Sequence, residues 1–307
     1  MLKSRVITAV IMLALFLLAL FGLPDGGWAV LVIVVVLQGS AEWSRLSRFS
    51  HATANRFWGV SLAVMLGLVW LDMNYSPEQT FAVHVTVYFM SLLLWLVVVP
   101  AWLIAGWKVE LPAPGPQPTQ KTGSAETQGE VIPAPDVSQR RVTPSVVMAL
   151  IGWTVLIPTG LAMMDLRQDH PLWLLGMMSL VWVADISAYF AGRRFGKIKL
   201  APSISPGKTW EGVAGAMLGV SVCVLLGWIF APFKIHIAFL PTLLIASWCW
   251  VGLAVVGDLF ESLIKRQAGV KDSGSLLPGH GGLLDRIDAL TSTLPLAALA
   301  ILLQHIS

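Results

Sequence analysis

One short polar run lies between two apolar stretches and carries most of the charge in the last third of this chain. The run covers residues 262–288 and reads SLIKRQAGVKDSGSLLPGHGGLLDRID. It combines carboxylates, cations, a histidine and closely spaced glycines: Asp272, Asp285, Asp288, Lys265, Arg266, Lys271, Arg286, His280, Gly279, Gly281 and Gly282. Carboxylates attract divalent cations, whereas cationic side chains and unhindered backbone N–H groups attract phosphate. Because a membrane border adjoins the run, these residues predict a site for a lipid phosphate.

Three aspartates at the ends of apolar stretches are the candidate metal ligands. Asp285 and Asp288 stand three residues apart at the predicted start of the last helix, so their side chains share one face and could hold one or two cations. Acidic residues in a first turn also complement the helix dipole, which is the favoured interpretation of an isolated DRID motif. Asp258 shifts the balance towards metal, because an unpaired carboxylate at membrane depth costs about 2.5–3.5 kcal/mol. Asp185 lies inside another apolar stretch, where we expect either an arginine partner or a place beside the metal and substrate.

A second candidate for phosphate contact is the loop over residues 201–212, APSISPGKTWEG. Its hydroxyls and its cation precede a predicted helix whose N-terminal amides suit an anion: Ser203, Ser205, Lys208 and Thr209. A helix N-cap with a lysine anchored at the membrane interface explains the same residues equally well. A P-loop is excluded, because that motif requires glycine where this chain has Pro202.

Other residues of the C-terminal run have an ordinary interpretation beside the chemical one. Lys265 and Arg266 could simply retain their segment on the cytoplasmic side of the membrane. The turn PGHGG presents unhindered amides at a helix entrance, which favours phosphate oxygens near Gly281 and Gly282. A histidine in such a turn is more often structural than catalytic, so we predict no general-base role for His280.

The composition is that of an integral membrane protein. Hydrophobic residues make up 56% of the chain and charged residues 12%, with a mean hydropathy of +0.76, whereas about a quarter of the residues in soluble proteins are charged. Apolar runs long enough for membrane helices lie at 6–23, 28–41, 57–72, 81–104, 146–164, 172–191, 212–231, 237–257 and 289–305. The sequence therefore predicts an all-α, polytopic protein with about nine transmembrane helices. Glu42, in the segment AEWSRL, receives no functional role at this stage.

The placement of positive charge predicts a cytoplasmic N-terminus. Lysine and arginine are retained on the cytoplasmic side during insertion. With the N-terminus inside, 18 of the 20 lysines and arginines fall on that side, and Arg167 and Lys234 fall outside. Both polar motifs, 193–212 and 258–288, then face the compartment that holds nucleotides. No small-x-small cleavage site precedes Pro24, so we expect an uncleaved first helix rather than a signal peptide.

The chain has a polar interruption near its middle. Residues 111–138 are rich in Pro, Gln and Thr and too polar to form a core of their own. Cys223 and Cys249 lie in predicted spans and indicate neither a disulfide nor a zinc site. We therefore predict three parts: about four transmembrane helices in 1–110, a disordered cytoplasmic linker in 111–145, and a catalytic transmembrane domain of about five helices in 146–307.

The C-terminal run also resembles, at every fixed position, the signature of the phosphatidate cytidylyltransferases, the CDP-diacylglycerol synthases. The matching residues are Ser262, Lys265, Arg266, Lys271, Asp272, Gly274, Leu277, Pro278, His280, Gly281, Gly282, Asp285, Arg286 and Asp288. The segment from Asp185 through KLAPSISPGKTWEG to GDLFES is similar to that family as well, so the resemblance covers 180–290. The linker is longer than the family leads us to expect.

The resemblance implies a reaction and a set of roles. It implies a Mg²⁺-dependent attack of the phosphatidate phosphate on the α-phosphorus of CTP, in which Asp258, Asp285 and Asp288 bind the metal. Lys265 is then a further catalytic residue, and Asp185 and Asp272 lie beside the site. The expected substrate contacts are Ser203, Ser205, Lys208, Thr209, Arg266, Lys271, His280, Gly281, Gly282 and Arg286.

Two other functions stay open at this point. A CTP-dependent polyprenol or phytol kinase would transfer the γ-phosphate and leave CDP, whereas a synthase transfers CMP and leaves pyrophosphate. A secondary transporter could use Asp185 and Asp258 as ion sites, although we find no convincing inverted repeat. The expected partners are CTP, phosphatidate and membrane lipids in a bacterial cytoplasmic (inner) membrane. No nucleic-acid partner is expected, and a homodimer is left open.

Overall fold

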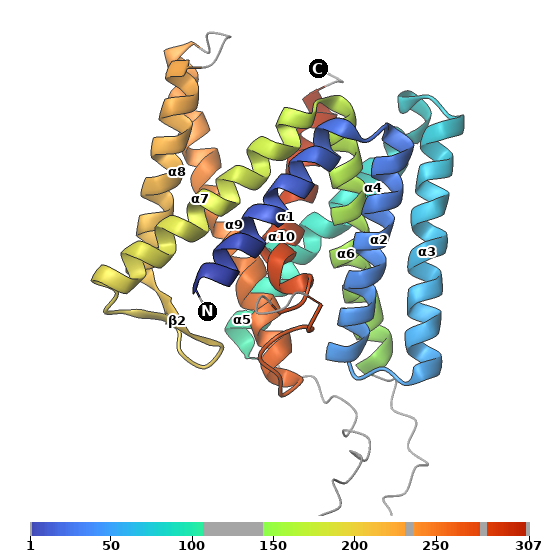
Figure 1. Cartoon of the computed structure of the whole chain (residues 1–307), viewed down its shortest axis with the longest axis horizontal. Coiled ribbons are helices and arrows are strands. Elements are labelled where there is room, and N and C mark those ends of the chain that lie inside the picture. Colours follow the sequence, from blue (N-terminus) through green and yellow to red (C-terminus); the bar gives the residue numbers. More distant parts are fainter. Residues whose placement is uncertain (1, 107–143, 231–235, 277–280, 305–307) are drawn as a thin grey trace, which may run out of the picture.

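The computed structural model describes residues 2–106, 144–230, 236–276 and 281–304, and helices fill nearly all of these ranges (Figure 1). The helices are α1 (Leu2–Gly22), α2 (Asp25–Leu46), α3 (His51–Asn74), α4 (Pro77–Leu93), α5 (Val99–Ala105), α6 (Pro144–Asp169), α7 (Pro171–Phe195), α8 (Trp210–Phe230), α9 (Leu240–Gln267) and α10 (Leu284–Gln304). A π-helical turn, η1 (Leu94–Val98), joins α4 to α5, and a 3₁₀ turn, η2 (Ile237–Phe239), precedes α9.

These helices confirm the all-α, polytopic prediction. In the described part of the chain, eight helical segments are long and apolar enough to cross a membrane, and α1 adds a shorter apolar stretch, Val10–Gly22. Each predicted apolar run overlaps one of these segments. The predicted linker and Lys234 lie outside the described residues, except that α6 already begins at Pro144.

Local sequence explains where several helices begin. The side chain of Ser50 accepts a hydrogen bond from the backbone N–H of Thr53 (3.2 Å) at the start of α3. At the start of α4, Gln79 accepts from the backbone N–H of Ser76 (3.0 Å), and Pro77 occupies the first helical position. These contacts satisfy amides that a helix terminus leaves unpaired.

Two local features near the predicted site differ from expectation. The loop over 201–212 contains a hairpin, in which β1 (Lys199–Ala201) pairs antiparallel with β2 (Ser205–Thr209). The eighth span continues past 257 to Gln267, so that Lys265 lies on α9 rather than in a loop, and Asp258 lies within this helix rather than at its end. The polar end of α9 stays helical because it carries a Glu–Lys pair at i, i+4 and cations in its last turn, both of which stabilise a helix.

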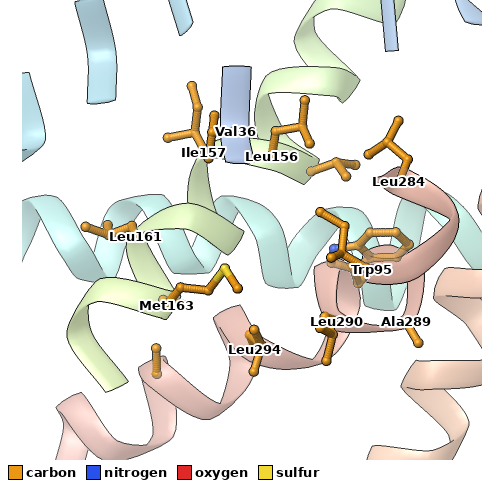
Figure 2. Close-up of a cluster of buried hydrophobic side chains, with 14 of the residues drawn as sticks. Val36, Trp95, Leu156, Ile157, Leu161, Met163, Leu284, Ala289, Leu290 and Leu294 are labelled. Atoms are coloured by element: carbon orange, nitrogen blue, oxygen red, sulfur yellow. The ribbon is translucent and has the colours of Figure 1, made fainter. Parts of the chain in front are cut away.

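One hydrophobic core joins the first and second halves of the chain. Figure 2 shows part of it, where α2, η1, α6 and α10 meet. The labelled side chains are Val36, Trp95, Leu156, Ile157, Leu161, Met163, Leu284, Ala289, Leu290 and Leu294. The predicted N-terminal helices thus pack directly against the helix that follows the C-terminal motif.

Helices α7 and α8 lie side by side, and α8 is at the left edge of the bundle in Figure 1. A Cβ atom at Gly215 or Gly219 of α8 would collide with Ala191 or Ser187 of α7. Small residues let two membrane helices approach closely. The hairpin connects this close pair and lies at the same end of the molecule as the N-terminus, opposite the C-terminus (Figure 1).

Candidate active site

A buried glutamate of α2 holds the turn that leads into α10. Glu42 is 0% exposed, and its carboxylate accepts hydrogen bonds from the backbone N–H groups of Leu283 and Leu284, at 2.9 Å each. It also accepts from Ser273 Oγ (2.9 Å) and Gln38 Nε2 (3.0 Å). Leu284 is the first residue of α10, so Glu42 supplies negative charge to amides that the helix N-terminus leaves unpaired. From the sequence we assigned Glu42 no role; in the structure its carboxylate holds the turn of the candidate site.

Asp285 fixes the same turn from within it. Its Oδ2 atom accepts hydrogen bonds from the backbone N–H of Gly282 (2.8 Å) and from the N–H (2.9 Å) and Oγ (3.0 Å) of Ser273. Its Oδ1 atom accepts from Lys265 Nζ (2.6 Å). The Ser273 hydroxyl lies between the carboxylates of Glu42 and Asp285, and its single proton can be donated to one of them at a time. These contacts tie α2, the end of α9 and the turn before α10 together.

Steric constraints explain why glycine occupies three positions in and near this turn. Gly281 has φ of +79°, a left-handed conformation that glycine adopts without strain. A Cβ atom at Gly282 would collide with Ser273 Oγ and Glu42 Oε2, and one at Gly274 would lie 2.9 Å from Glu42 Oε1. The backbone therefore packs directly on the Glu42 carboxylate. The amide of Gly282, which the sequence suggested as a phosphate donor, is bonded to Asp285.

The end of α9 carries acids and a lysine on one face. Lys265 Nζ donates to Glu261 Oε2 (2.5 Å) as well as to Asp285. Glu261 is buried, and its Oε1 atom has no hydrogen-bond partner among the described residues. A buried carboxylate oxygen without a partner is costly, so a cation beside it would be stabilised. Asp258 lies three residues before Glu261 on α9. Both acids lie within electrostatic range of Asp288, which is on α10.

Asp258 and Asp288 are brought together by a close helix crossing. A Cβ atom at Gly257 of α9 would lie 2.5 Å from Ser292 Oγ and 2.7 Å from the carbonyl oxygen of Asp288, both on α10. The carboxylate of Asp288 accepts a hydrogen bond from the backbone N–H of Ala289 (2.8 Å), and its carbonyl oxygen accepts from Thr291 Oγ1 (2.6 Å). This arrangement offers oxygen donors from two helices. In the part of the chain that the structure covers, however, Asp258, Asp285 and Asp288 do not have ligand atoms all within 4.8 Å of one another.

A cavity of about 510 Å³ opens beside Asp258, between α7, α8, α9 and the hairpin. Lys208 of β2 forms an ion pair with Asp258 in its wall, with Nζ 2.6 Å from Oδ2. Asp185 of α7 also lines the cavity, within electrostatic range of both partners. Ser205 and Thr209 complete the hairpin wall. The Thr209 hydroxyl accepts from the N–H of Gly212 (3.2 Å), which is the helix-capping role weighed for this loop.

The other predicted contacts lie on the surface around this region. Those that are exposed are Ser203, Arg266, Lys271, Asp272 and Arg286. Arg266 donates through Nε to the carbonyl oxygen of Ile204 (3.4 Å), which links the end of α9 to the hairpin turn. His280 lies outside the described residues. The structure therefore pairs Lys208 with Asp258 and Lys265 with Asp285, and it leaves the exposed cations at the rim.

Sequence comparison gives the class of this membrane protein: the chain belongs to the cytidylyltransferase family, which it matches over residues 3–304, and it is therefore a nucleotidyltransferase. It is 33% identical over 310 residues to the phosphatidate cytidylyltransferase of Haemophilus influenzae, with 96% of each chain covered. It is 35% identical over 301 residues to the phosphatidate cytidylyltransferase of Pseudomonas aeruginosa, with 97% of this chain and 96% of that one covered. An uncharacterized Escherichia coli protein, YnbB, is 40% identical over 147 residues, which is 47% of this chain.

Proposed function

We propose that this protein transfers CMP from CTP to phosphatidate, forming CDP-diacylglycerol and releasing pyrophosphate. Two relatives named for this reaction align with nearly the whole chain. The structural observation that carries the proposal is the Lys208–Asp258 pair in the cavity wall. In this pair, a cation suited to phosphate, Lys208 on β2, contacts an acid suited to a metal, Asp258 on α9.

We assign Mg²⁺ to the acids Asp258, Asp285 and Asp288, with room for a second cation. Mg²⁺ prefers oxygen donors and usually takes one or two carboxylates, completing its coordination with water and substrate phosphate. A preformed cage of three acids is therefore not required. The unpartnered Oε1 of Glu261 supports a cation in this region. When bound, the metal would neutralise the triphosphate and the leaving pyrophosphate.

In this proposal Lys208 and Lys265 bind carboxylates before substrate binds and phosphate when substrate is bound. Lys208 and Lys265 neutralise Asp258 and Asp285 through contacts of 2.6 Å each. We propose that each ammonium group turns from its carboxylate to a phosphate oxygen when CTP and metal bind, so that the charge of the site stays balanced. The exposed cations Arg266, Lys271 and Arg286 would attract the anionic headgroup to the rim.

The chemistry requires little beyond this positioning. An oxygen of the phosphatidate phosphate forms a bond to the α-phosphorus of CTP, and the bond from that phosphorus to the bridging oxygen of pyrophosphate breaks. Because the attacking oxygen is already an anion, no general base is needed, in keeping with the expectation for His280. Catalysis comes from alignment and from charge neutralisation.

We further propose that the site faces the cytoplasm of a bacterial inner membrane. The hairpin and the N-terminus share one end of the bundle (Figure 1), and the excess of lysine and arginine at that end favours retention inside.

The test is an assay of the purified, full-length protein in detergent with CTP, phosphatidate and Mg²⁺. The expected products are CDP-diacylglycerol and pyrophosphate in equal amounts. Asp258→Asn serves as the inactive control, because it keeps the side-chain volume and removes the charge. Formation of CDP with a phosphorylated polyprenol or phytol, and none from phosphatidate, would favour the kinase alternative and overturn the proposal.

A further inference from the structure

A second cluster of ionisable side chains lies at the opposite end of the bundle from the hairpin. Asp72 is near the end of α3, His84 is in the second turn of α4, and Asp165 is in the last turn of α6. Together they line a cavity of about 290 Å³ that also reaches Ile301 near the end of α10. None of these residues takes part in the site described above.

The histidine of this cluster is held between the two acids. His84 Nε2 lies 3.0 Å from Asp72 Oδ1, and His84 Nδ1 lies 3.0 Å from Asp165 Oδ2. The histidine is only 7% exposed. Among the described residues, Nε2 has no hydrogen-bond partner of good direction, although Asp72 Oδ1 lies at hydrogen-bond distance from it. A buried ring nitrogen in the cavity wall thus has a carboxylate beside it and no proper partner.

The donors of this cluster are of the types that hold a transition-metal ion, an imidazole nitrogen and two carboxylate oxygens. One nitrogen of His84 and one oxygen of each aspartate lie within 4.8 Å of one another. Zinc-type ions take nitrogen and oxygen ligands at about 2.0–2.2 Å, and tetrahedral ligands at that distance lie about 3.4 Å apart. The three donors come from three helices, α3, α4 and α6, so an ion bound to them would link these helices.

The surroundings resemble those of a metal ligand set. Tyr88, one turn after His84, is buried and donates its hydroxyl to Asp165 Oδ2 (2.6 Å). A hydrogen bond of this kind fixes the orientation of a ligating carboxylate. Two carboxylates and a neutral imidazole carry two negative charges, which one dication balances. The cavity leaves space for water at a further coordination position.

We propose that Asp72, His84 and Asp165 bind one divalent transition-metal ion of the zinc class. The imidazole ligand favours such an ion over Mg²⁺ or Ca²⁺, which prefer oxygen alone. The ion would join α3, α4 and α6 at the end of the bundle away from the reaction. Its role is to stabilise the fold, and it is independent of CTP.

The experiment uses the purified full-length protein in detergent, stripped with a chelator and kept in excess Mg²⁺ so that oxygen-only sites are filled. Co²⁺ is titrated and followed by its visible absorption, and bound Zn²⁺ is counted by elemental analysis after dialysis. We expect one ion per chain and a rise in Tm with Zn²⁺ that further Mg²⁺ does not produce. No bound transition metal in the wild-type protein would overturn the proposal.

Variants decide where the ion binds. Tyr88→Phe should weaken binding by about 10–100-fold, because Tyr88 acts through Asp165. His84→Asn and Asp165→Asn each remove a ligand and should weaken binding further. The matched control is His170→Asn. His170 is an exposed histidine at the start of α7 that accepts a hydrogen bond from the Leu172 N–H, and asparagine can accept the same bond. Phosphatidate cytidylyltransferase activity, measured in parallel, reports whether each variant is folded. Unchanged Co²⁺ binding in folded His84→Asn and Asp165→Asn would refute the assignment.

Discussion

Replacement of Glu42 by glutamine tests whether a carboxylate on α2 holds the signature turn in its active form. Glutamine has nearly the same volume, but it has one acceptor oxygen where glutamate has two. Its NH₂ group must therefore face either the N–H of Leu283 or the N–H of Leu284 together with Ser273 Oγ, all of which are donors to Glu42 in the native protein. The variant loses a charge-assisted hydrogen bond and places two donors against each other in a buried position.

The size of the effect follows from these contacts. A hydrogen bond to a charged group contributes about 1.5–3 kcal/mol, and the attraction of a carboxylate to a helix N-terminus adds about 0.3–1 kcal/mol. The ordered turn should therefore lose about 2–4 kcal/mol, and at about 1.4 kcal/mol per factor of ten this is roughly 30-fold to 1,000-fold. We expect kcat/KM for phosphatidate to fall by an amount in this range at saturating Mg²⁺.

The assay compares kcat/KM and Tm for the wild-type protein, Glu42→Gln and a control. Glu78→Gln is the matched control, because Glu78 is an exposed acid in the first turn of α4, at the other end of the bundle. The control should keep both values. If Glu42→Gln keeps kcat/KM within roughly threefold of wild type, a loss below about 0.7 kcal/mol, the turn does not depend on Glu42 and the reasoning is refuted.

Four further predictions concern the metal, the phosphate contact, the helix crossing and the topology. Asp288→Asn should insert and fold but lose most of its turnover, and full activity at limiting Mg²⁺ would remove Asp288 from the metal set. Lys208→Gln should lower kcat/KM for CTP or phosphatidate by about 1.5–3 kcal/mol, whereas an unchanged value would leave Lys208 a topology signal. Gly257→Ala should lower the free energy of unfolding by about 1–3 kcal/mol, because its Cβ would lie 2.7 Å from a backbone oxygen of α10, while Gly252→Ala, which has no atom within 4 Å, should not. A single cysteine in 111–138 should react with a membrane-impermeant thiol reagent only after cell lysis, and labelling in sealed cells would contradict a cytoplasmic site.

The helices could be predicted because a membrane span depends on the residues of the span alone. Every run of apolar residues between polar clusters became a helix. The end of α9 was missed for a related reason: hydropathy stops at Asp258, but the Glu261–Lys265 pair continues the helix by local electrostatics. A count of i, i+4 charge pairs beyond the apolar run would have found this extension.

The site could be predicted only in part. The signature identified the acids and lysines, since their types carry the chemistry wherever they lie. The roles of Glu42 and of the His84 cluster depend on pairing across the fold, because Glu42 contacts residues more than 230 positions away. The one available signal for Glu42 was an acid directly after the apolar run 28–41, where a carboxylate at a membrane border needs a partner.

The central claim is tested most directly by following the phosphorus atom that reaches the lipid. The purified protein is given phosphatidate, Mg²⁺ and CTP labelled with ³²P at either the α- or the γ-position. A cytidylyl transfer predicts lipid label from α-labelled CTP and labelled pyrophosphate from γ-labelled CTP. Lipid label from γ-labelled CTP, with CDP as the other product, would contradict the account.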